Sequence, residues 1–199
     1  MRLFDPLPLD VPRPLVLLRL GYRHSGQVPE KTTRLLDEVI AQGKPLLAPR
    51  AVCGTFEVAR EGEAFVVGGA LRSASRSLAE RLNGCSRASL FAATIGQTLE
   101  DWIRVLNDRG ELTRALLADA YGSSAAIALG TSIEMAVAAE FRALGLTPTK
   151  RYAPGYGDFE LEAQAPLMAL VDAGRIGITL TPEHLMLPGK SISGVIGGR

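Results

Sequence analysis

The sequence has few residues of the kinds that mark metal centres, disulfide frameworks and nucleic-acid-binding surfaces. Its 199 residues include two cysteines, Cys53 and Cys85, and two histidines, His24 and His184, with no metal-ligand spacing between them. Two cysteines are too few for a disulfide framework, so free buried thiols in a reducing cytoplasm are expected. The 22 basic and 21 acidic residues give a net charge of +1. This balance excludes the basic footprint of a nucleic-acid-binding protein.

Export signals, membrane-spanning runs and common catalytic motifs are also absent from the sequence. The first residues, MRLFDPLPLDVPRP, place acids and prolines where a signal peptide needs a continuous apolar run. The uncharged stretch 120–133 is 14 residues long, whereas a bilayer requires about 20. No nucleophile elbow, Walker loop or strand-anchored GxGxxG occurs. These absences favour a soluble protein that binds a small ligand or a neutral partner surface over an acid-base enzyme.

The hydrophobic content predicts a single domain over residues 1–199. The chain is 47% hydrophobic and 22% charged, and it shows no internal repeat or low-complexity linker. A chain of this size buries about 70% of the surface that its unfolded form exposes, so it needs no disulfide for stability.

Hydrophobic periodicity predicts an α+β fold in which a long central helix, 111–144, packs with a mixed or antiparallel sheet. Gly122 and Gly130 each cost this helix about 1 kcal/mol of propensity, so a kink is expected near one of them. Asp158 is predicted to cap the helix that follows it. The other expected elements are strand 15–20, helix 30–42, hairpin 51–60 and 64–67, helix 73–82, strand 89–95, helix 98–107, helix 159–173 and strands 176–180 and 191–196.

The loop 150–158, KRYAPGYGD, has the composition of a small-molecule cradle. Gly155 and Gly157 permit positive φ and close approach of a ligand to the main chain. Arg151 offers a planar set of donors for a carboxylate or phosphate, and Tyr152 and Tyr156 offer aromatic faces for a cation. The alternative is a Pro-Gly-Tyr turn that only reverses the chain between two helices.

A second motif follows at residues 176–194, IGITLTPEHLMLPGKSISG. Together with RYAPGYGDF, this stretch resembles the C-terminal activation domain of cobalamin-dependent methionine synthase. That domain has an Arg-x-x-Pro-Gly-Tyr loop, followed in the same order by Leu-Thr-Glu…Met…Pro-Gly-x-Ser-Val-Ser-Gly. The ATIG segment at 93–96 and the AYGSSAA segment are similar to small stand-alone proteins of this type.

The resemblance implies an S-adenosylmethionine-binding component of cobalamin-dependent methionine synthesis. In the synthase, this domain binds S-adenosylmethionine and places its methyl group over oxidised cobalamin, so that one-electron reduction and methyl transfer restore methylcobalamin. A stand-alone chain of this type is expected to act in trans on a corrinoid-binding protein or a truncated methionine synthase that carries the cobalamin.

The resemblance also implies a set of ligand contacts. Arg151 matches the arginine that meets the methionyl carboxylate, and Tyr156 matches the tyrosine beside the ligand. Glu134 is near the position of an acidic ligand contact on the long helix. The loop residues whose main chain would line the ligand are Ala153, Pro154 and Gly155.

Departures from the family pattern keep a second function open. Gly157, Asp158 and Phe159 stand where the synthase has Pro-Ala-Cys-Pro, so the floor of the pocket is expected to differ. The further strand and helical tail of the synthase domain have no counterpart before Arg199. The alternative function is a ligand-free interaction module that docks on a corrinoid-binding domain or forms a homodimer. An ordinary small-molecule methyltransferase is disfavoured because neither motif holds a general base.

Overall fold

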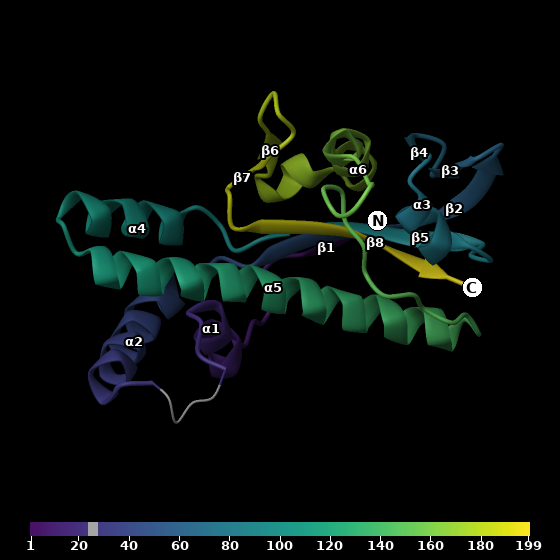
Figure 1. The fold of residues 1–199 in the computed structure, drawn as a ribbon. Coiled ribbons are helices and arrows are strands. Elements are labelled where there is room, and N and C mark those ends of the chain that lie inside the picture. Colours follow the sequence, from purple (N-terminus) through teal and green to yellow (C-terminus); the bar gives the residue numbers. More distant parts are fainter. Residues whose placement is uncertain (24–27) are drawn as a thin grey trace.

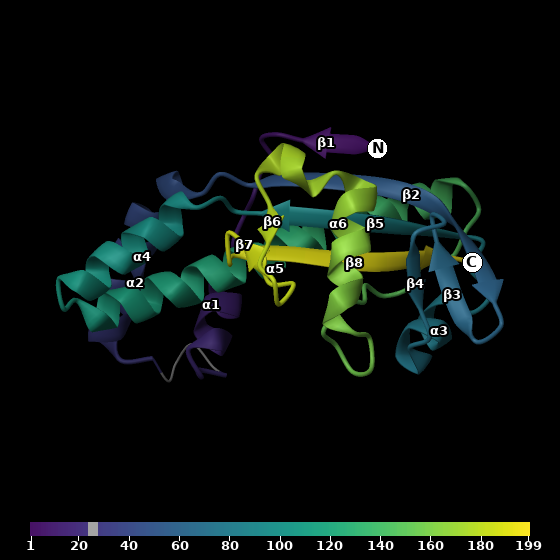
Figure 2. The ribbon, with the colours of Figure 1, turned by 90° about the horizontal axis from the view of Figure 1, so that it is seen from above.

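Three long antiparallel strands form the centre of the computed structural model, which describes residues 1–23 and 28–199. They are β2 (Arg50–Glu61), β5 (Arg87–Thr94) and β8 (Ser191–Gly198). β5 lies between the other two and pairs with both of them (Figure 2). The predicted strands 51–60, 89–95 and 191–196 are confirmed, whereas His24 lies outside the described residues.

Shorter strands extend this sheet on the side of β2. β3 (Ala64–Val67) forms the predicted hairpin with β2, and β4 (Leu71–Ser73), which the sequence did not predict, pairs with β3. β1 (Arg2–Phe4) pairs with the first part of β2. All of these pairings are antiparallel, as expected of an α+β fold.

Helices cover both faces of the sheet (Figure 1). One face carries α5 (Leu112–Ala143) with α1 (Arg13–Arg19), α2 (Glu30–Gly43) and α4 (Thr98–Asp108). The other face carries α3 (Arg76–Leu82) and α6 (Gln164–Val171). Side chains along β5 alternate between the two cores: Phe91 belongs to the α5 side, and Leu90 and Ala92 belong to the α6 side.

α5 is the core helix that the sequence predicted, and it runs without a break from Leu112 to Ala143. It is long and apolar enough to cross a membrane by length and composition alone, but 56% of its most apolar window is buried inside the fold. The kink expected at Gly122 or Gly130 is wrong. Neighbouring side chains occupy the space beside both glycines, so each glycine permits a close approach to the helix instead of breaking it.

The strand predicted at 15–20 is wrong, because this segment forms α1. Pro12 is the N-cap residue and Pro14 lies in the first turn, where a missing N–H leaves no hydrogen bond unmade. Val16 and Leu17 are buried in the core on the α5 side. The proline-rich entry therefore begins a helix, and tertiary packing outweighs the β propensity of the apolar run.

The helix predicted at 159–173 is shorter and interrupted in the structure. A 3₁₀ turn at Leu161–Ala163 precedes α6, and a second one, Ala173–Ile176, follows after Asp172 adopts the left-handed conformation. The predicted strand 176–180 is reduced to β6 (Thr179–Leu180), which pairs with β7 (Met186–Leu187) in a small separate hairpin.

Candidate functional site

The two sequence motifs meet at β8. Tyr152 and Val195 exchange main-chain hydrogen bonds, with N···O distances of 3.0 and 2.7 Å. The Arg-x-x-Pro-Gly-Tyr loop therefore runs beside the strand that contains the Ser-x-Ser-Gly motif.

Arg151 lies between α5 and β8 at two glycines. A side chain at Gly130 of α5 would overlap the Arg151 guanidinium, and one at Gly194 of β8 would lie 2.7 Å from Arg151 Cγ. The Nη1 atom of Arg151 is buried and has no hydrogen-bond partner among the described residues. A buried, unpaired guanidinium N–H is costly, so a ligand acceptor at this position would stabilise the site.

Glu134 fastens the start of the loop to α5. Its Oε1 accepts a hydrogen bond from the main-chain N–H of Arg151 at 3.1 Å. The resemblance implies that Glu134 contacts the ligand, and the structure places its carboxylate on the protein main chain next to Arg151. This hydrogen bond holds the start of the loop, and Arg151 with it, against α5.

The two tyrosines of the loop differ in how their rings are used. The Tyr152 hydroxyl donates to the main-chain oxygen of Tyr156 at 2.8 Å. The Tyr152 ring stacks on Phe159, with centroids 6.0 Å apart, and the Arg81 guanidinium lies 4.7 Å from its centroid. The cation and the ring that pack on Tyr152 are thus groups of the protein itself. Tyr156 is 65% exposed, so its ring is accessible to a ligand.

The main chain of the loop is partly engaged in its own turn. Gly155 has φ of +87° and donates its N–H to the oxygen of Phe159 at 2.7 Å. Ala153 and Pro154 line the hollow beside α5, whereas Gly155 does not. Of the three residues predicted to line the ligand with their main chain, two lie at the hollow and Gly155 shapes the turn.

Two adjoining hollows form a groove along α5. The first, of about 170 Å³, is lined by Arg151, Tyr152 and Ser193 among others. The second, of about 280 Å³, continues from the loop towards α1 and the start of β8. Both are lined by Ala153, Tyr156, Ile192 and Ser193, so they are continuous. Together they fall within the range of small-molecule sites, roughly 300–1,000 Å³.

Four polar groove residues were given no role from the sequence: Arg19, Ser123, Gln164 and Lys190, of which Lys190 lies in the second motif. Gln164 Oε1 accepts from the Ser193 hydroxyl at 2.7 Å, which holds α6 against β8. The four residues come from α1, α5, α6 and the β7–β8 connection. No local motif joins them, because only the tertiary fold brings these segments together.

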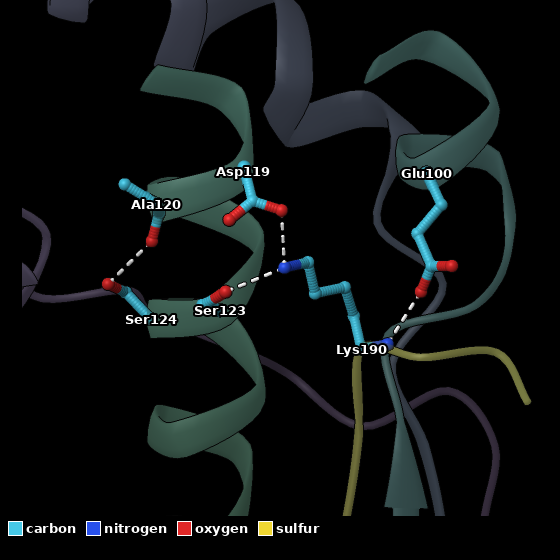
Figure 3. A network of polar contacts seen from close by, with 6 residues as sticks. All are labelled: Glu100, Asp119, Ala120, Ser123, Ser124 and Lys190. Carbon is cyan, nitrogen blue, oxygen red and sulfur yellow. Dashed lines mark hydrogen bonds and ion pairs between the residues drawn. The ribbon is translucent and has the colours of Figure 1, made fainter. Parts of the chain in front are cut away.

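Lys190 is the centre of a polar network at the far end of the groove (Figure 3). Its Nζ donates to Asp119 Oδ1 at 2.6 Å and to Ser123 Oγ at 2.7 Å, both on α5. Its main-chain N–H donates to Glu100 Oε1 of α4 at 2.5 Å. These contacts fix the Pro-Gly-Lys segment of the second motif against two helices.

Asp158 holds the loop against α3 and does not cap the helix that follows it in sequence. Its carboxylate accepts from the Ser75 hydroxyl at 2.7 Å and from the main-chain N–H groups of Arg76 and Ser77 at 2.7 and 3.2 Å. Hydrogen bonds from Ser75 and Ser77 hold the pKa of Asp158 well below its usual range, because they favour the charged carboxylate. The predicted cap of helix 159–173 is thus wrong.

A larger hollow of about 590 Å³ lies along the C-terminal half of α5 and residues 148–150. It includes Glu134 but neither Arg151 nor Tyr156. The groove is the stronger candidate because it is lined by Arg151, whose buried Nη1 has no partner among the described residues. Within residues 1–23 and 28–199, no three His, Cys, Asp or Glu side chains gather as a metal site would require.

Comparison with known proteins supports an assignment of the fold. Neither a protein-family model nor a curated protein sequence matches this chain. Among solved structures, the crystal structure of the MetH reactivation domain bound to AdoHcy matches with a TM-score of 0.65 and 19% sequence identity. The fold is that of the MetH reactivation domain. The match covers 84% of this chain and 65% of the MetH reactivation-domain chain, so this chain spans about two thirds of that structure.

Proposed function

We propose that the groove binds S-adenosylmethionine and that the protein supports reductive reactivation of a corrinoid protein in trans. The observation that carries this proposal is the buried, unpaired Nη1 of Arg151 at one end of a groove. The fold adds support, since the reactivation domain of MetH was crystallised with AdoHcy, the demethylated form of this ligand.

The residues of the groove fit the chemical groups of S-adenosylmethionine. The Arg151 guanidinium would receive the carboxylate, with Glu134 holding its main chain in place. The exposed Tyr156 ring would lie beside the sulfonium, and a ring within about 6 Å favours such a cation by roughly 0.5–2 kcal/mol. The ligand supplies a transferable methyl group when it is bound. The residues of this chain bind and orient it, and none is placed to act as a nucleophile.

Isothermal titration calorimetry tests the ligand. Wild-type protein should bind S-adenosylmethionine, and Arg151→Ala should bind it at least tenfold more weakly, since a charge-assisted hydrogen bond contributes about 1.5–3 kcal/mol. Arg142→Ala, which removes an exposed arginine of α5 that does not line the groove, is the matched control. Absence of heat at millimolar ligand, or equal affinity of both variants and wild type, would reject the proposal.

A second candidate is an interaction module that docks on a corrinoid-binding domain without a ligand of its own. Exposed apolar side chains near the groove favour it: Tyr156, Leu185 and Leu187 are 65%, 54% and 50% exposed. A pull-down with a corrinoid-binding domain separates the two candidates. Capture that does not depend on S-adenosylmethionine and survives Arg151→Ala supports the module, whereas capture that requires both supports the ligand-dependent function.

A further inference from the structure

The groove has a second polar end, about 10 Å along α5 from Arg151. Gly130 marks the position of the guanidinium on α5, and Ser123 lies seven residues earlier, which corresponds to about 10 Å at a rise of 1.5 Å per residue. Arg19 of α1 and Lys190 line the same part of the groove as Ser123. A ligand held by its carboxylate at Arg151 and extended along α5 would reach these three side chains.

Lys190 and Ser123 each keep one hydrogen-bond donor without an acceptor among the described residues. Lys190 Nζ has three N–H groups, of which two are bonded to Asp119 and Ser123. Ser123 Oγ accepts from Lys190, so its own hydroxyl hydrogen remains available. The neighbouring Ser124 differs, because its hydroxyl donates to the Ala120 oxygen at 2.8 Å (Figure 3).

Arg19 adds a guanidinium to this set. It lies in the last turn of α1, is exposed, and forms no ion pair with any acid in the part of the chain that the structure describes. A guanidinium has five N–H donors and no acceptor atom. Three donors from three segments therefore line one end of the groove.

The local charges indicate which acceptor these donors suit. The two cations, Arg19 and Lys190, are balanced by Asp119 and Glu100, both of which bond to Lys190. A phosphate or a second carboxylate would meet no net positive charge here and would lie near two carboxylates. Neutral acceptors such as ribose hydroxyls and purine ring nitrogens accept hydrogen bonds without this repulsion.

We infer that the end of the groove formed by Arg19, Ser123 and Lys190 recognises the nucleoside part of the ligand through its neutral acceptors. This inference rests on the proposed function, since it takes the carboxylate at Arg151 and the nucleoside at the opposite end. It makes Arg19 and Ser123 specificity-determining residues that neither sequence motif contains.

Binding of ligand fragments tests the inference on the full chain. Adenosine and S-adenosylhomocysteine are titrated by two-dimensional NMR into wild type, Arg19→Met, Ser123→Ala and Arg151→Ala. Arg19→Met and Ser123→Ala should weaken both ligands by the same factor, roughly tenfold for Arg19 because its hydrogen bond comes from a charged donor. Arg151→Ala should weaken only S-adenosylhomocysteine, since adenosine has no carboxylate.

The controls separate this inference from the proposed function. Arg109→Met, an exposed arginine after α4, should change neither affinity, and the exposure of Arg19 means that its replacement should leave the fold intact. If Arg151→Ala weakens S-adenosylhomocysteine while Arg19→Met and Ser123→Ala change nothing, only the nucleoside inference is wrong. If adenosine binds through Arg19 but S-adenosylhomocysteine does not bind, the proposed function is wrong and the nucleoside site stands. Absence of binding by both ligands rejects both.

Adenosine 5′-monophosphate tests the choice of neutral acceptors. It should bind no more tightly than adenosine, because the four local charges cancel. Binding at least tenfold tighter that is lost in Arg19→Met would show an oxyanion site and would contradict the inference.

Discussion

The substitution Gly130→Ala tests how the groove holds Arg151. In the interior of an ordinary helix, glycine to alanine raises stability by about 1 kcal/mol. At Gly130 the added methyl group would overlap the Arg151 guanidinium and would lie 2.9 Å from Ile192 Cδ1. The Ile192 methyl group is the end of a flexible side chain and can shift, whereas the guanidinium can move only by leaving its place between α5 and β8.

The expected result is a loss of stability in place of a gain. Overpacking of this kind costs about 1–3 kcal/mol, so it cancels the propensity gain at the least and leaves a net loss of about 2 kcal/mol at the most. Urea denaturation followed by circular dichroism measures the change in the free energy of unfolding. Calorimetry on the same variant should show S-adenosylmethionine binding weakened at least tenfold, because the displaced guanidinium no longer faces the groove.

A double-mutant cycle shows whether Arg151 is the cause. In Arg151→Ala protein the obstacle is gone, so Gly130→Ala should recover most of its propensity gain and give a coupling energy of about 1–3 kcal/mol. Gly122→Ala is the matched control: it lies on the same helix, but its methyl group would meet Leu99 Cδ2 at 2.7 Å. Its effect should be unchanged by Arg151→Ala. If Gly130→Ala stabilises wild type by about 1 kcal/mol and is additive with Arg151→Ala, the packing described here is wrong.

Three further predictions concern the loop. The folded pKa of Asp158 is below its ordinary value of 3.8, so its stabilisation is complete above that value and is lost as the pH falls from it through the lower folded pKa. The difference in Tm between wild type and Asp158→Ala should therefore be constant above about pH 5 and shrink below pH 4. Glu134→Gln should retain ligand affinity in calorimetry because its amide oxygen can accept from Arg151 N–H, whereas Glu134→Ala should lose it; equal losses would indicate direct ligand contact by the carboxylate. Tyr152→Phe removes the hydrogen bond to the Tyr156 oxygen and should lower the free energy of unfolding by about 0.5–1.5 kcal/mol in urea denaturation.

The sequence predicted the elements whose apolar pattern is regular and long. The hydrophobic pattern of the sequence correctly indicated three helices, α2, α4 and α5, and the three central strands. In each of them, the positions of the apolar residues reflect which faces of the element are buried. Prediction failed where short segments depend on tertiary contacts. The apolar run 15–20 has strand composition, yet it packs as α1 with Val16 and Leu17 in the core on the α5 side.

The candidate site could be predicted only in the parts that lie within one stretch of chain. Arg151 and Tyr156 stand in a turn with unusual composition, and the structure places both on the groove. Asp158 was assigned to the wrong helix. The N-cap rule assigns a polar residue to the helix that follows it in sequence, whereas Asp158 accepts hydrogen bonds from the first N–H groups of α3, some 80 residues earlier. Arg19 lies outside both motifs and Lys190 lies inside the second one, but neither could be placed on the groove from the sequence, since only the fold brings α1 beside the β7–β8 connection.

Two glycines that break local rules meet at the same arginine. Gly130 weakens a helix interior and Gly194 weakens a strand interior, and each substitution to alanine would collide with Arg151. The guanidinium that they admit has a buried N–H with no partner among the described residues, which adds a further cost. A fold that needed only to be stable would gain from alanine at Gly130 and from a smaller apolar side chain at residue 151. Sequences depart from local consistency mainly at functional sites, so these coincident departures support the proposal that a ligand site is built around Arg151.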